Sequence, residues 1–148
     1  MNHEKFMKIA LKEAKKAAKK KEVPIGAVIV KNDKVIAKAH NLREKSNLAT
    51  GHAELLAIQK ANKKLKSWRL DRCTLYVTIE PCPMCAGAII QSRIGKLVYG
   101  AQDLKSGTHQ SVVNLFDKTF NHKVDVEYGI MEEECGQVVT EFFRKIRK

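Results

Sequence analysis

A buried strand, a helix and a second buried strand follow one another in the middle of this sequence, and this succession constrains the fold most. Residues 74–79 form an apolar run rich in β-branched side chains, and Lys96 to Tyr99 form another. Between them, the segment from about Pro83 to Ser92 is expected to be a helix. The alternation predicts a βαβ crossover, and therefore parallel strands within a sheet.

The flanking segments extend this pattern into an α/β fold in which helices cover a mixed sheet. A hairpin is expected where two β-branched runs flank Lys31-Asn32-Asp33, and helices are expected where apolar residues recur at helical spacing. The expected elements are a helix from His3 to Lys21, strands at Ile25 to Val30 and Lys34 to Ala39, a helix from Ala53 to Leu65, a short helix near Val112 to Phe116, a strand at Val124 to Tyr128 and a closing helix from Glu132 to Ile146.

The length of 148 residues is typical of one domain, so a single domain is expected over residues 1–148. No run reaches the roughly 18 apolar residues of a membrane span, and the N-terminus lacks the apolar stretch and cleavage site of a secretory signal. We therefore expect a cytoplasmic protein with no membrane segment. In that setting the four cysteines indicate metal or redox chemistry rather than disulfides.

The formal net charge of +12 favours polyanionic partners, and nucleic acid first among them, because cations that neutralise phosphates release counterions. Part of this charge lies near the N-terminus, at Lys12, Lys15, Lys16, Lys19 and Lys20. The alternative is that these lysines only solvate an exposed helix face.

Two short motifs carry the chemistry, and each stands where the chain is expected to enter a helix. The first is His52-Ala53-Glu54, and the second is Pro81-Cys82-Pro83-Met84-Cys85. Cys82 and Cys85 are three residues apart, so on the first turn of a helix both sulfur atoms face one side. The helix N-terminus favours their thiolate forms, which zinc requires. With His52 they make the three protein ligands of a catalytic zinc site.

Glu54 is expected to be the catalytic proton carrier beside this metal. Zinc acidifies a water molecule, and a carboxyl group within hydrogen-bond reach can pass the proton to a ring nitrogen and later protonate a departing amine. The combination of His-x-Glu with Pro-Cys-x-x-Cys is the known signature of this hydrolytic deamination. Because Glu54 lies two residues after His52, both reach one water only if His52 stands at the very start of its helix.

A closed structural zinc site is the alternative, with Cys73, His40 or Cys135 as a fourth ligand. Cys73 opens a buried strand and Cys135 lies in the closing helix, so both cysteines are expected to pack as small apolar residues instead. A zinc-stabilised RNA-binding subunit without catalysis is a further alternative, but such a subunit is expected to lack the glutamate.

Matching stretches that extend well beyond the two motifs reveal a family resemblance. They are Glu22 to Val28, Trp68-Arg69-Leu70, Leu75 to Ala88, Ser92-Arg93-Ile94, Tyr99-Gly100-Ala101, Asn121-His122, Glu133-Glu134-Cys135 and Phe142-Phe143-Arg144. Over nearly its whole length the chain resembles the bacterial tRNA-specific adenosine deaminases, which convert the wobble adenosine of an anticodon, position 34, to inosine. The resemblance implies a three-layer α/β/α cytidine deaminase-like fold with a central mixed sheet of about five strands. It also implies one zinc ion per subunit and a homodimer whose two subunits contact the tRNA anticodon loop.

The resemblance further implies a set of substrate-binding residues. It places Asn41 near the flipped base and its ribose, Asp103 and Lys105 in an RNA-facing loop, and Phe143 and Arg144 in a C-terminal helix beside the RNA. The alternatives are that Asn41 only ends a hairpin and that the phenylalanines belong to the core. We expect one ring of Phe142-Phe143 to pack and the other to face the substrate, with cations up to Arg147 and Lys148 around them.

Two positions depart from the family pattern. Gly51 stands before His52, where alanine is common, and is expected to loosen that approach. His109 follows the RNA-facing loop, at a position where smaller residues are usual, and it is either a solvated loop residue or an RNA contact. His122 is expected to cap or pack rather than to bind metal. The runner-up function is deamination of a free base, nucleoside or nucleotide, namely cytidine, deoxycytidylate or guanine.

Overall fold

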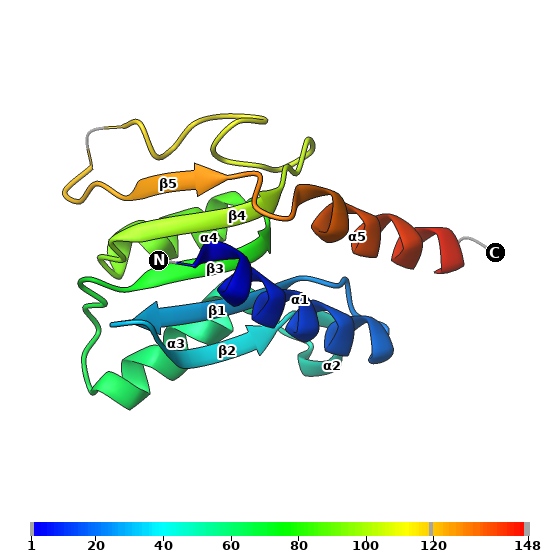
Figure 1. The fold of residues 1–148 in the computed structure, drawn as a ribbon, viewed down its shortest axis with the longest axis horizontal. Helices are drawn as coiled ribbons and strands as arrows, with labels where there is room; N and C mark the ends of the chain where they lie inside the picture. Colours follow the sequence, from blue (N-terminus) through cyan, green and yellow to red (C-terminus); the bar gives the residue numbers. More distant parts are fainter. Residues whose placement is uncertain (1, 119, 147–148) are drawn as a thin grey trace.

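The computed structural model describes residues 2–118 and 120–146, and its centre is a mixed five-stranded sheet in the order β2-β1-β3-β4-β5 (Figure 1). The strands are β1 (Gly26–Lys31), β2 (Lys34–His40), β3 (Thr74–Ile79), β4 (Lys96–Ala101) and β5 (Asp125–Tyr128). β1 runs antiparallel to β2 and to β3, whereas β4 is parallel to β3 and to β5. The hairpin and the βαβ crossover are thus confirmed.

Helices cover both faces of the sheet and complete the three-layer α/β/α fold. α1 (His3–Lys19) and α5 (Glu132–Ile146) lie on one face, and α3 (Ala53–Leu65) and α4 (Pro83–Gln91) lie on the other (Figure 1). Successive strand residues point to opposite faces, so Ile29 packs with α3 and α4 while Val28 packs with α1. None of the helices in the described residues has the length and apolar character that a membrane crossing needs.

The middle of α1 packs against the start of β1 and the end of β2. A Cβ atom on Gly26 would overlap the carbonyl oxygen of Ala10, so α1 can approach β1 this closely only over a glycine. The buried carboxylate of Glu13 on α1 accepts a hydrogen bond from His40 Nδ1 at 2.9 Å. His40 is the last residue of β2, so this contact fixes the backbone directly before Asn41.

One expected helix is absent and one short helix was missed. Val112 to Phe116 is a series of turns and bends rather than a helix, because the Asn114 side chain accepts a hydrogen bond from the backbone N–H of Phe116 at 2.9 Å and so competes with helical bonding. The single-turn helix α2 (Arg43–Ser46), which follows β2, was not expected. The first helix also ends at Lys19 rather than Lys21, since Lys21 takes a positive φ of 62°.

Candidate active site

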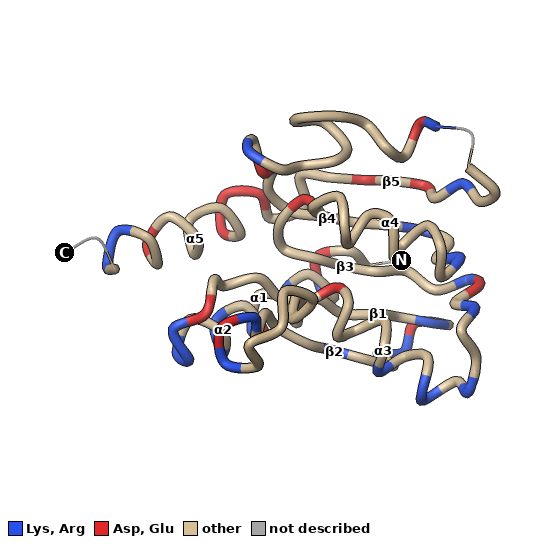
Figure 2. The backbone as a smooth tube through the Cα atoms, turned by 180° about the vertical axis from the view of Figure 1, so that it is seen from behind, with Lys and Arg blue, Asp and Glu red and all other residues tan. Residues whose placement is uncertain are grey.

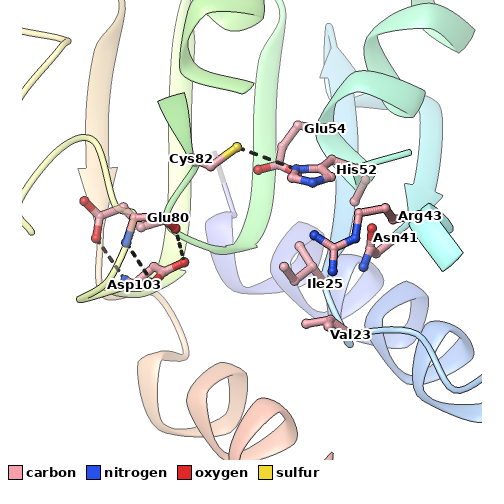
Figure 3. Close-up of a pocket in the computed structure, with 11 residues that line it drawn as sticks. Val23, Ile25, Asn41, Arg43, His52, Glu54, Glu80, Cys82 and Asp103 are labelled. Carbon is pink, nitrogen blue, oxygen red and sulfur yellow. Dashed lines mark hydrogen bonds between the residues drawn. The ribbon is translucent and has the colours of Figure 1, made fainter. Parts of the chain in front are cut away.

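His52 stands at the junction between a loop and α3. It occupies the N-cap position with an extended backbone, at φ −89° and ψ 146°, so the expectation that it precedes the first helical turn is confirmed. Glu54 follows within that turn, is buried, and lines the same pocket as His52 (Figure 3). The loosening expected at Gly51 is not found, because Gly51 is buried and its carbonyl oxygen accepts a hydrogen bond from the N–H of Leu42 at 2.9 Å.

The two cysteines occupy the start of α4, on the same face of the sheet as α3. Cys82 is the N-cap residue and Pro83 takes the first helical position, where its missing N–H has no partner to lose. His52 Nδ1 lies 3.6 Å from Cys82 Sγ and 3.5 Å from Cys85 Sγ. The fold therefore brings His52 together with two cysteines that lie 30 and 33 residues further along the sequence.

These separations match the spacing of ligands around a zinc ion. Zinc–nitrogen bonds of about 2.0 Å and zinc–sulfur bonds of about 2.3 Å, at a tetrahedral angle, place the nitrogen and sulfur about 3.5 Å apart. In the structure the three ligand atoms all lie within 4.8 Å of one another. His52, Cys82 and Cys85 can therefore hold a metal ion, and their nitrogen and sulfur atoms are the donors that zinc prefers.

The side chains considered as a fourth protein ligand are engaged elsewhere. His40 hydrogen-bonds to Glu13, and Cys73 and Cys135 are buried with the apolar cores of opposite faces of the sheet. Within the described residues, the metal-binding group contains only His52, Cys82 and Cys85. The geometry thus leaves one side of the group to the pocket, as a catalytic site needs.

The ionisable groups of the site influence one another strongly. Burial raises the pKa of Glu54 to about 7, so this carboxyl group can both accept and release a proton near neutral pH. A hydrogen bond from the Cys85 thiol, with a further one from His52, lowers the pKa of Cys82 to about 4. The hydrogen bond to Cys82 and burial raise the pKa of Cys85. One thiolate is therefore present even before a cation neutralises the pair.

A pocket of about 190 Å³ opens beside these groups (Figure 3). Asn41 and Arg43 border it on one side, and Glu80 and Asp103 border it on the other. Asn41 is only 6% exposed, and its Oδ1 atom has no hydrogen-bond partner among the described residues. A buried, unpaired acceptor costs free energy, so this atom marks a position where a ligand can donate a hydrogen bond.

A wider chamber of about 730 Å³ adjoins the pocket and shares part of its lining, including Arg43 and Asp103. Lys105 and Phe143 both line this chamber, although they are far apart in the sequence. Arg144 is exposed on α5 and lines neither hollow, and Arg147 and Lys148 lie outside the described residues. Phe142 and Phe143 are both half-buried, and Phe142 lines a groove beside α1 instead.

The loop with Asp103 and Lys105 has a fixed internal structure. Asp103 Oδ1 accepts hydrogen bonds from the N–H groups of Lys105 at 3.1 Å and Ser106 at 3.3 Å, and Asp103 Oδ2 accepts one from the Ser106 hydroxyl at 2.7 Å. Asp103 therefore shapes the loop as well as lining the pocket. It has the turn-forming role that aspartate commonly takes at such positions.

Glu80 was missed as a functional residue by sequence reasoning. Its buried carboxylate accepts hydrogen bonds from the N–H groups of Asp103, His109 and Gln110 at 3.0, 2.7 and 2.9 Å, and from the Ser111 hydroxyl. Burial by itself would raise the pKa of Glu80, but these hydrogen bonds favour the charged form and hold the pKa below its ordinary value. The only sequence signal is its place directly before Pro81-Cys82.

Two further histidines that the sequence singled out make packing contacts, and one arginine that it did not single out lines the pocket. His109 Nδ1 hydrogen-bonds with the Tyr99 hydroxyl at 2.9 Å and its ring packs against Tyr128, so it is not simply solvated. His122 Nε2 donates to the carbonyl oxygen of Ile94 at 2.7 Å, as expected for a packing residue. Arg43, which the sequence did not single out, lines both the pocket and the chamber.

The fold and the site define a deaminase: residues 1–147 match the family model described as MafB19-like deaminase. The chain is 54% identical to the tRNA-specific adenosine deaminase of Bacillus subtilis over 97% of its own length and 89% of that protein. A solved structure from studies of A-to-I editing by tRNA:A34 deaminases aligns with a TM-score of 0.88 and 45% identity, over 90% of this chain and 98% of that one. The chain therefore belongs to the family of tRNA-specific adenosine deaminases.

A more distant likeness concerns a different substrate class. The guanine deaminase of Bacillus subtilis aligns with a TM-score of 0.66 and 34% identity, over 82% of this chain and 88% of that one. The same scaffold thus serves deaminases of different substrates, so the substrate has to be argued from the site.

Proposed function

We propose that this chain removes the amino group of the wobble adenosine of tRNA, at position 34 of the anticodon, by hydrolysis. The products are inosine and ammonia. The observation that carries the proposal is the meeting of His52, Cys82, Cys85 and Glu54 at one pocket, in a chain 54% identical to a tRNA-specific adenosine deaminase. The high positive charge supports an RNA substrate over a free base.

In this proposal His52, Cys82 and Cys85 hold one zinc ion per subunit. When bound, zinc supplies a Lewis acid that activates water at neutral pH. Glu54 takes a proton from the attacking water and gives it to the ring nitrogen next to the reacting carbon. It then takes the second proton of the added water and gives it to the amine, so that the carbon–nitrogen bond breaks, a carbonyl group forms and ammonia leaves. A carboxyl group whose pKa is raised by burial suits both transfers.

The target adenosine leaves its stack to enter the pocket, as enzymes that modify bases require. Asn41 accepts a hydrogen bond from the bound nucleoside through its unpaired Oδ1 atom. Asp103 and Lys105 border the path of the neighbouring nucleotides, and Phe143 offers an aromatic surface in the wider chamber. Arg144, exposed beyond that chamber, contacts a phosphate.

The protein is also proposed to act as a homodimer in the cytoplasm. Support comes from large apolar side chains that remain exposed in the single chain, including Met84, Val112, Val113 and Phe120. A subunit interface over these side chains would remove their apolar surface from water. The cytoplasm is where bacterial tRNA is modified and used.

The competing function is deamination of a free base, which the likeness to a guanine deaminase favours. The deciding experiment incubates the zinc-loaded protein with tRNA bearing adenosine at position 34 and, separately, with free adenosine, guanine and cytidine. Nucleoside analysis is expected to show inosine at position 34 of the tRNA. Deaminated product from the free compounds alone would overturn the proposal.

A further inference from the structure

The exposed face of α1 is almost entirely cationic. Its opposite face is buried against the sheet through Phe6, Met7, Ala10, Leu11, Ala14 and Ala17. Four exposed lysines, spaced four, three and four residues apart, fall on one side of the helix. These four residues, here named the α1 stripe, are Lys8, Lys12, Lys15 and Lys19.

The charge of the α1 stripe is not neutralised within the described chain. Glu13, a neighbouring acid on the same helix, is buried and already bound to Lys16 at 2.8 Å and to His40 at 2.9 Å. The described ion pairs of the protein include none of the four stripe lysines. A row of unpaired like charges repels itself, and an external polyanion can relieve that repulsion.

The stripe ends beside the active-site pocket. α1 finishes at Lys19, and Val23, only four residues later, lines the pocket. Next to it, Lys20 Nζ lies 3.0 Å from His40 Nε2, immediately before Asn41. α1 runs toward the same ends of the strands at which α2 and α5 lie (Figure 1), and lysines and arginines colour the tube along the end of α1 and α2 (Figure 2).

A groove joins the stripe to α5. It has a volume of about 220 Å³ and is lined by Lys15 on α1 and by Phe142 and Lys145 on α5. Two cations beside a half-buried aromatic ring form the type of surface that contacts both phosphates and bases. The only acid in its lining is Glu141.

We propose that the α1 stripe binds the ribose-phosphate backbone of the tRNA outside the anticodon loop, and this rests on the proposed function. A helix of 17 residues is about 25 Å long, so a row of lysines along it extends well beyond a pocket that holds one nucleoside. Each lysine that meets a phosphate releases a counterion, which adds affinity without reading sequence.

An anionic membrane is the other polyanion that such a helix can meet, and the packing of α1 argues against it. Helices that lie in a membrane surface insert an apolar face between the lipids. The apolar face of α1 is buried against the sheet, so only its cationic face is available. The continuity of the stripe with the pocket favours RNA.

The test replaces the three lysines nearest the pocket in one variant, Lys12→Gln, Lys15→Gln and Lys19→Gln. A matched control, Lys34→Gln, Lys63→Gln and Lys64→Gln, removes the same charge from exposed positions at the hairpin turn and the far end of α3. Lysine and glutamine have similar helix propensities, so both variants should fold, and circular dichroism checks this.

Steady-state deamination of intact tRNA with adenosine at position 34 is measured over a range of salt concentrations. The stripe variant is expected to raise KM at least about tenfold at 0.1 M salt, with kcat unchanged, and to reduce the slope of log affinity against log salt by about 2 to 3. The control variant should have the KM and the salt slope of the wild type. Equal effects in the two variants, or none in the stripe variant, would overturn the inference.

Direct binding separates this inference from the proposed function. If the wild-type protein forms no inosine in tRNA, the proposed function fails, but filter binding of labelled tRNA still reports on the stripe. Selective loss of tRNA affinity in the stripe variant supports the inference. Selective loss of binding to phosphatidylserine vesicles, with tRNA affinity intact, would assign the stripe to a membrane and overturn it.

Discussion

The carboxylate of Glu80, just after β3, accepts a hydrogen bond at 2.7 Å from the backbone N–H of His109, 29 residues further along the chain. The same carboxylate holds the N–H groups of Asp103 and Gln110. One buried side chain thereby positions the loop that forms a wall of the active-site pocket. Because Cys82 follows two residues later, the anchor of this wall and a metal ligand lie on one short segment of backbone.

Replacing Glu80 by glutamine should loosen this loop. The amide retains the shape of the carboxyl group, but its NH₂ faces N–H donors and leaves at least one of them unpaired, which costs about 1–3 kcal/mol of folding free energy. We expect a higher KM for tRNA with bound zinc retained, together with faster hydrogen exchange at residues 103–110. Unchanged exchange in that segment would show that the loop is held by other contacts.

The pH dependence of stability follows from the same group. The pKa of Glu80 in the folded protein lies below the ordinary value of about 4.3, so its stabilising effect is complete above that pH. The effect is lost as the pH falls through the lower folded-state pKa. Urea unfolding of the wild type and of Glu80→Gln should be measured at pH 7 and at pH 3.5. The difference between their free energies of unfolding should be smaller at pH 3.5. A larger difference at pH 3.5 would contradict a lowered pKa for Glu80.

Gly107 should be intolerant of a side chain. A Cβ atom there would overlap the Glu80 carboxyl group, whereas a Cβ atom on Gly87 in α4 would meet nothing within 4 Å. We expect Gly107→Ala to lower the free energy of unfolding by about 1–3 kcal/mol through overpacking. The control Gly87→Ala should be neutral or stabilise by about 0.5–1 kcal/mol, because alanine favours a helix. Thermal unfolding of both variants measures the difference.

Glu54→Ala should retain zinc and lose turnover. Removal of a general acid–base group typically lowers kcat by about 10²- to 10⁴-fold, and here one carboxyl group serves more than one transfer. Elemental analysis should give one zinc per subunit for this variant and less for Cys82→Ser. Chelation should abolish wild-type activity, and added zinc should restore it. Loss of zinc along with the carboxyl group would mean that Glu54 is a ligand rather than a proton carrier.

Asn41→Ala should impair catalysis without harming stability. Its Oδ1 atom has no partner in the described residues, so removal costs the folded protein little, while a lost hydrogen bond to substrate lowers kcat/KM by about 10- to 100-fold. Asn62 provides the contrast, because its amide donates to the carbonyl oxygens of Ser67 and Trp68. Asn62→Ala should lower the melting temperature and leave kcat/KM unchanged. The reverse pattern would refute the role of Asn41.

The parts of the site that could be predicted from sequence depend on local chemistry. A histidine and two cysteines at the starts of helices follow from the preference of proline for the first helical turn and from ligand spacing within a few residues. The wall of the pocket could not be predicted in this way. The loop of residues 102–116 depends on Glu80, which is distant in sequence, and Arg43 lies in a single helical turn too short to show periodicity.

The placement of His52 and Cys82 directly before helices also bears on which changes in chain length this site can accept. The connection at residues 66–73 lies between the far end of α3 and the start of β3, so insertions there can lengthen a surface turn without moving either helix start. A single residue added between His52 and Glu54, or between Cys82 and Cys85, turns the second side chain by about 100° around its helix. Insertions and deletions should therefore accumulate between the two motifs and be absent within them.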